Sequence, residues 1–86
     1  NGFPLAISGN YPTLLVFHQD TFGTIGKVAN ILGDYSINVG SMQVARKEKG
    51  DEALMTCELD DYISEDVLGL IRKVPGVVTV SLMGDA

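Results

Sequence analysis

The chain has 86 residues, of which 45% are hydrophobic and 20% charged, and its formal net charge is −5. This composition is typical of one small globular domain and excludes a disordered tail, and every apolar run is shorter than the roughly 20 residues that span a bilayer. The negative charge argues against nucleic acid and anionic membranes as partners, because both attract basic surfaces.

The first half of the chain is predicted to form a strand, a helix and a second strand. Residues 1–12 contain glycine and proline breaks and are interpreted as a linker or the tail of a preceding domain. Residues 13–18 are apolar on both faces, which suits a central strand, and residues 23–35 change to a helical period. A strand follows at 37–46, where the alternation slips around Gly40–Ser41 and indicates a bulge or a close backbone contact. The apolar positions of the predicted helix are Ile25, Val28, Ala29 and Leu32.

The second half of the chain repeats this pattern. Residues 47–51 are a predicted hairpin turn, and residues 52–60 are a predicted third strand. Ser64 is predicted to cap a second helix, Pro75–Gly76 ends it, and residues 77–83 form the last strand. The apolar face of this helix is predicted to contain Val67, Leu70, Ile71 and Val74. One side of the last strand is predicted to contain Val78, Val80 and Leu82.

The order of the elements predicts the fold class. Two strand–helix–strand halves form an α+β, ferredoxin-like βαββαβ sandwich, with one four-stranded antiparallel sheet and two helices on one face. Right-handed crossovers place the strands in the order 4-1-3-2. The domain is predicted to occupy residues 13–84, with residues 85–86 as a C-terminal tail.

The polar turn at residues 18–26 is the predicted functional site. A strand that ends in a glycine-bearing turn and continues into a helix leaves N–H groups free to bind a small anion, such as the carboxylate of an amino acid. The turn contains no nucleophile–base pair, metal cluster or phosphate loop. We therefore predict binding rather than catalysis, with no catalytic residue and no metal ligand.

Three polar residues are candidates for contact with a ligand, and each also has a purely structural interpretation. His18 ends a strand and is either satisfied by local hydrogen bonds or aimed at a ligand. Asp20 is either a solvated turn residue or an acceptor for an ammonium group. Asn38 interrupts an apolar strand, where asparagine is disfavoured, and is either an outward amide or a group that holds a zwitterion.

Other chemistries are weakened by the residues present. The Gly23–Gly26 GxxG joins a strand to a helix on an acidic chain, which disfavours the RNA-clamping tetrad of KH domains. The single cysteine, Cys57, excludes an internal disulfide and favours a cytosolic location, and its apolar neighbours predict buried packing. The acids Glu58, Asp60 and Asp61 are interpreted as a solvated cluster, since no calcium-loop spacing follows.

The chain resembles an ACT domain, the small ligand-sensing module of amino-acid metabolism. The resemblance is carried by residues 18–23, 36–39 and 74–77. Within the family it is most similar to the C-terminal ACT domain of the iron–sulfur-dependent L-serine dehydratase β subunit or region, through residues 8–15 and 42–53. The resemblance implies a non-catalytic regulatory domain of a cytoplasmic enzyme that converts L-serine to pyruvate and ammonia in serine metabolism and gluconeogenesis.

The resemblance also implies a ligand site shared between two domains. It predicts a homodimer that binds a small amino acid, with L-serine favoured, and a catalytic domain or subunit as a further partner. The implied binding residues are His18, Asp20, Phe22, Gly23, Thr24 and Asn38. In the serine-binding relatives, the positions of His18 and Asp20 come from one subunit and that of Asn38 from the other. Here Asp20 stands where the family has an amide, and Phe22 where it has proline.

The resemblance places the cofactor outside this chain. A [4Fe–4S] cluster needs several cysteine ligands, and the chain has one cysteine, so the cluster is expected in the catalytic part of the parent enzyme. Two alternatives remain open from the sequence: a structural dimerisation module with an empty pocket, and the regulatory domain of phosphoglycerate dehydrogenase.

Overall fold

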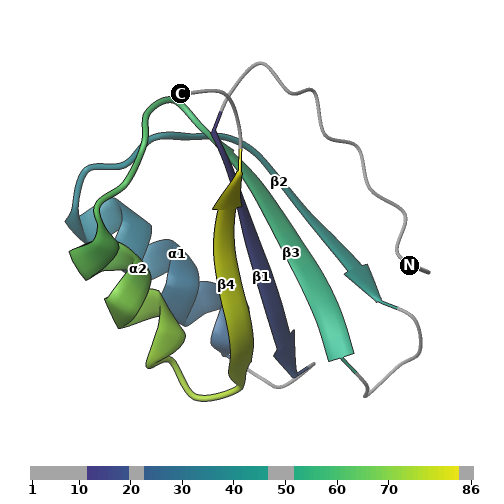
Figure 1. Cartoon of the computed structure of the whole chain (residues 1–86). Helices are drawn as coiled ribbons and strands as arrows, with labels where there is room; N and C mark the ends of the chain where they lie inside the picture. Colours follow the sequence, from purple (N-terminus) through teal and green to yellow (C-terminus); the bar gives the residue numbers. More distant parts are fainter. Residues whose placement is uncertain (1–11, 20–22, 47–51, 84–86) are drawn as a thin grey trace.

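The computed structural model describes residues 12–19, 23–46 and 52–83 (Figure 1). Three predicted segments lie outside the described residues: the linker up to residue 11, the hairpin turn at 47–51 and the C-terminal tail. The predicted end of the domain at residue 84 also lies outside them.

Six elements follow one another in the predicted order. They are β1 (Thr13–Gln19), α1 (Thr24–Asp34), β2 (Val39–Arg46), β3 (Glu52–Leu59), α2 (Glu65–Arg72) and β4 (Val77–Met83). The second strand begins at Val39 rather than at residue 37. Ser36 has a left-handed backbone (φ 57°), and the Ile37 N–H donates to the Leu32 carbonyl at 2.9 Å, so these residues close helix α1 instead of opening β2.

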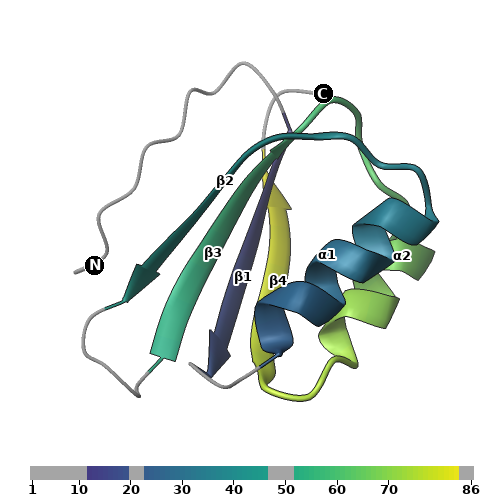
Figure 2. The ribbon, with the colours of Figure 1, turned by 180° about the vertical axis from the view of Figure 1, so that it is seen from behind.

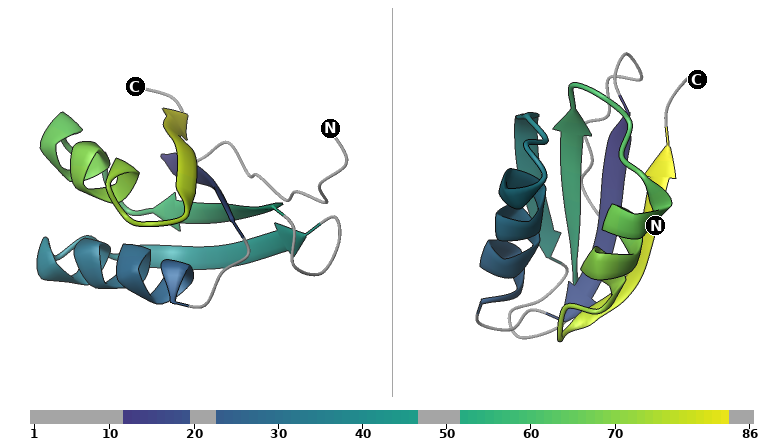
Figure 3. Two further views of the ribbon diagram at one scale, coloured as in Figure 1. Left: turned by 90° about the horizontal axis from the view of Figure 1, so that it is seen from below. Right: turned by 90° about the vertical axis from the view of Figure 1, so that its left-hand side faces the viewer.

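The four strands form one antiparallel sheet in the order β2-β3-β1-β4, which is the predicted order listed from the opposite edge. Both helices lie on one face of this sheet (Figure 2). Within the helical layer, α1 lies on the side of β2 and α2 on the side of β4 (Figure 3). The predicted ferredoxin-like α+β sandwich is therefore confirmed, and β1 is a central strand, as its two apolar faces predicted.

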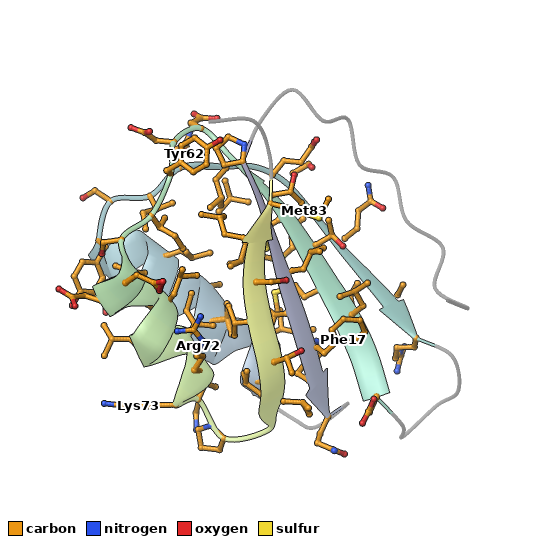
Figure 4. All side chains as sticks on the ribbon, viewed as in Figure 1. Phe17, Tyr62, Arg72, Lys73 and Met83 are labelled. Carbon is orange, nitrogen blue, oxygen red and sulfur yellow. The ribbon has the colours of Figure 1, made fainter. Side chains whose placement is uncertain are left out.

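The core fills the space between the sheet and the helices (Figure 4). Alternate residues of the two central strands point toward the helices, because cross-strand partners share a face. Their fully buried members include Leu14, Val16, Met55 and Cys57. From the helices, Val28 and Leu32 of α1 and Val67 and Ile71 of α2 complete this layer.

Three predicted core positions are wrong. Leu70 is 37% exposed, whereas Leu68 is 6% exposed. The buried face of the eight-residue helix α2 contains the adjacent residues Val67 and Leu68 together with Ile71. Ala29 of α1 faces solvent, because the buried face of this helix is centred on Thr24, Val28 and Leu32, which are four residues apart. Val78 is 51% exposed. The register between β1 and β4 shifts at Phe17/His18, so Val78 has no partner on β1 and does not share the inward face of Val80.

The two other local predictions are confirmed. Ser64 caps α2, and its Oγ accepts a hydrogen bond from the Val67 N–H at 3.3 Å. The register between β2 and β3 shifts between Val39 and Ser41, which is the bulge predicted around Gly40. At the other end of α2, Arg72 and Lys73 project from the last turn, where cations favour the helix dipole (Figure 4).

The exchange of Leu70 for Leu68 gives a matched test of the core. We expect Leu68→Ala to lower the free energy of unfolding by about 2–5 kcal/mol, because it leaves a cavity under α2. Leu70→Ala removes the same atoms from a more exposed position and serves as the control, with a smaller loss. Urea unfolding followed by circular dichroism measures both; equal losses would contradict the assigned helix face.

Burial of Cys57 also predicts a pH dependence of stability. Desolvation raises the pKa of the Cys57 thiol from 9.0 to about 11 in the folded chain. Between these values the folded state keeps a proton that the unfolded state loses, so the free energy of unfolding falls as the pH rises from about 9 to about 11. Urea titrations across this range should show a steeper loss for the wild type than for Cys57→Ala. Parallel losses would mean that the thiol does not contribute.

Candidate functional site

His18 lies near the end of β1 and its side chain is 1% exposed. Its Nδ1 lies 2.8 Å from the carbonyl oxygen of Gln19, and because a carbonyl can only accept, Nδ1 carries the proton. In the neutral ring Nε2 is then an acceptor. This atom is buried and has no hydrogen-bond partner among the described residues. A buried acceptor without a donor costs about 1–3 kcal/mol. A ligand hydroxyl or ammonium group that donated a hydrogen bond to Nε2 would remove this cost, which favours binding.

The start of helix α1 is shaped by Gly23 and Thr24. Gly23 is the N-cap residue, has φ 89° and provides no side chain to the N–H groups of the first turn, which contains no acidic residue. These N–H groups suit the carboxylate of a small ligand. The Thr24 side chain is 2% exposed, and its Oγ1 donates to the Pro75 carbonyl at 3.3 Å. This hydroxyl therefore ties α1 to the turn before β4.

Asn38 lies at the opposite end of the sheet from His18. It immediately precedes β2, next to the Val39–Leu59 pair, whereas His18 pairs with Ala53 at the other end of β3. β2 has eight residues, and at about 3.3 Å per residue its two ends are roughly 25 Å apart. His18 and Asn38 of one chain therefore cannot contact one small ligand.

The structure thus divides the predicted site residues into two groups. His18 lies near the end of β1, and Gly23 and Thr24 lie at the start of α1. Both segments bond to the Pro75–Gly76 turn, through Gln19 and Thr24, whereas Asn38 stands apart at the other end of the sheet. Asp20 and Phe22 lie outside the described residues, so their roles as ligand contacts stay predictions.

Sequence reasoning missed two partners of these residues. The Asn38 side chain donates to Asp60, although Asp60 is distant in sequence. The turn at Pro75–Gly76 adjoins the candidate site, because the Gly76 carbonyl accepts from the Gln19 N–H at 2.7 Å. The Pro75–Gly76 dipeptide was visible in the sequence as a helix stop, but its contact with β1 depends on the β1–β4 pairing.

The described residues do not fit an iron–sulfur cluster or another metal site. No group of three or more His, Cys, Asp and Glu side chains in these ranges is placed to hold a metal ion. Cys57 is buried within the core, and one thiolate cannot hold a [4Fe–4S] cluster. None of the helices in the described ranges is long and apolar enough to cross a membrane.

The described residues form a small α+β domain with a buried histidine, His18, near the end of its first strand and a glycine N-cap, Gly23, at the start of its first helix. A family model of the ACT domain matches residues 12–76, and the chain belongs to the ACT domain family. This confirms the resemblance seen in the sequence.

Two relatives from Bacillus subtilis extend this assignment. The chain is 51% identical over 99% of its length to a protein named as a probable L-serine dehydratase, beta chain, of which the match covers 39%. It is 43% identical over 96% of its length to a D-3-phosphoglycerate dehydrogenase, of which the match covers 16%. The chain therefore spans well under half the length of these curated relatives.

Solved structures support the fold alone, because their sequence identities are low. The ACT domain from GTP pyrophosphokinase of Chlorobium tepidum has a TM-score of 0.67 at 14% identity, with 86% of this chain and 99% of that chain covered. The C-terminal domain of the MgtC protein from Mycobacterium tuberculosis has a TM-score of 0.65 at 12% identity, with 94% of each chain covered.

The positive φ of Gly23 yields a test of the turn. No atom lies within 4 Å of a Cβ built at Gly23, so the strain of Gly23→Ala comes from the backbone alone. We expect this substitution to lower the free energy of unfolding by about 1–2 kcal/mol. Gly26→Ala, inside α1 and equally unobstructed, should instead raise it by about 0.5–1 kcal/mol. Thermal unfolding of both variants checks the signs, and a stabilising Gly23→Ala would contradict the left-handed turn.

Proposed function

We propose that the chain is the regulatory domain of an L-serine dehydratase and that it binds L-serine between two copies of itself. The observation that carries the proposal is the buried His18 Nε2, which has no hydrogen-bond partner among the described residues, in the segment that leads to the start of α1, where the N-cap residue Gly23 has no side chain. The helix N-terminus suits the ligand's carboxylate, and Nε2 accepts a hydrogen bond from its hydroxyl or ammonium group. Catalysis and the [4Fe–4S] cluster belong to a part of the parent protein outside this chain.

The separation of His18 and Asn38 supports a shared site. In an antiparallel two-fold dimer, the start of β2 in one copy lies level with the end of β2 in the other, and therefore with His18. Each copy would then supply the group that the other lacks. Neither site is complete in a single chain.

The position of Asn38 also favours one sheet edge as the one that pairs. β2 and β4 are the two edges, and both carry exposed apolar side chains, so hydrophobicity does not decide between them. If β2 pairs with β2, Asn38 of the second copy lies three strand spacings from β1, about 14 Å. If β4 pairs with β4, the separation is five spacings, about 24 Å. Pairing through β2 therefore brings the two groups closer together than pairing through β4, and we propose that the β2 edges pair.

Binding at such an interface provides regulation. L-Serine would stabilise the paired arrangement in which both halves of the site meet, and the parent enzyme would respond to the resulting shift between arrangements. The identity with the dehydratase beta chain, 51% against 43% for the phosphoglycerate dehydrogenase, favours the dehydratase as the parent.

The shared site predicts complementation between two inactive variants. His18→Ala and Asn38→Ala should each weaken L-serine binding at least about tenfold, because each removes a hydrogen bond to a charged or buried group. A refolded mixture of the two variants should regain binding, because each mixed dimer contains one site with both residues intact. Isothermal titration calorimetry of the separate and mixed variants measures this.

The controls separate the competing interpretations. Each variant mixed with itself gives the baseline, and glycine and L-alanine test the need for the hydroxyl. If the mixture binds no better than its components, the two residues do not act across an interface. If the folded wild type associates but binds no L-serine, the chain is a structural dimerisation module.

A further inference from the structure

Asp60 holds Asn38 at two points. The Asn38 Nδ2 donates to Asp60 Oδ2, and the Asp60 N–H donates to the Asn38 carbonyl at 3.1 Å. An ionised carboxylate can only accept hydrogen bonds, so the amide orientation follows from its partner. The nitrogen of the Asn38 amide faces Asp60, and its oxygen, Oδ1, is turned away.

The bulge at the start of β2 lets Asp60 take this position. A Cβ built at Gly40 would lie 3.7 Å from Asp60 Oδ1 and 3.6 Å from the Glu58 carbonyl oxygen. The Asp60 carboxylate therefore lies close to the Gly40 backbone, where no side chain intervenes. The neighbouring acid has a different partner, because Ser41 Oγ donates to Glu58 Oε1 at 2.9 Å. Asp61 is also engaged elsewhere, since its Oδ1 accepts from the Tyr62 N–H at 2.8 Å. Asp60 is therefore the acid that orients Asn38.

This arrangement gives the Asn38 side chain one chemical preference. An asparagine amide can in principle donate to a carboxylate or accept from an ammonium group. Here one of the two N–H groups of the amide donates to the Asp60 carboxylate, and no Lys or Arg is paired with Asp60 in the part of the chain that the structure describes. A ligand carboxylate at Asn38 would be repelled by Asp60, whereas an ammonium group would find both an acceptor and an opposite charge.

We propose that Asp60 is a positioning and specificity-determining residue, which turns Asn38 into an acceptor for the ligand's α-ammonium group. This inference rests on the proposed function and fixes the direction of the ligand in the shared site. The carboxylate lies at the start of α1 in one copy, and the ammonium group lies at Asn38 and Asp60 of the other. Asp60 thereby makes the site select amino acids over the corresponding 2-hydroxy acids.

The test compares L-serine with L-glycerate, which has a hydroxyl group in place of the ammonium group. Asp60→Asn keeps an acceptor oxygen and the side-chain volume but removes the charge. The Kd of L-serine should rise about fivefold, the size of an exposed charge interaction, while the Kd of L-glycerate stays unchanged or falls. Asp61→Asn makes the same charge change at a carboxylate engaged with Tyr62, and should leave the ratio of the two Kd values unchanged.

The ratio of Kd values separates positioning from a general structural role. If Asp60→Asn weakens both ligands equally, or Asp61→Asn moves the ratio as far, Asp60 does not recognise the ammonium group and the inference is overturned. If the wild type binds L-serine and L-glycerate equally well, the inference is overturned while the proposed site stands. If the folded wild type binds neither acid, the proposed function fails, and the inference fails with it.

Discussion

The antiparallel pairing of β1 with both β3 and β4 is the constraint on which the rest of the structure depends. It makes the apolar Thr13–Gln19 strand central, so that its helix-facing side chains anchor the core and its last residues are held from both sides. The same pairing brings the Gly76 carbonyl to the Gln19 N–H and the Pro75 carbonyl to the Thr24 hydroxyl. The residues on both sides of the segment that joins β1 to α1 are thus held by the turn between α2 and β4.

The strand order has a second consequence, which concerns function. Because β2 runs parallel to β1, with β3 between them, its start lies at the end of the sheet opposite the β1–α1 turn. A chain with this topology separates His18 from Asn38 and leaves β2 as an open edge. In the proposed dimer, pairing through β2 would cover the exposed edge and complete the ligand site in a single event.

Polar groups at the two halves of the site are complementary. The His18 end offers helix N–H groups and one imidazole acceptor, whereas the Asn38 end offers an amide oxygen beside a carboxylate. An amino acid carries one negative and one positive group on the same carbon, so in the proposed site each half would take one of them. The overall charge of −5 does not oppose this, because a zwitterion carries no net charge.

The sequence by itself determined the element order, the Ser64 cap and the bulge near Gly40, because each depends on local periodicity or on one turn residue. The strand order was expected from analogy with the fold, and the structure confirms it. The sequence also singled out His18 and Asn38. Only the tertiary structure decided what these residues meet: the register shift that exposes Val78, the face of α2 that buries Leu68, and the Asn38–Asp60 hydrogen bond. These features depend on contacts between segments far apart in the chain, and a local pattern carries no information about its distant neighbours.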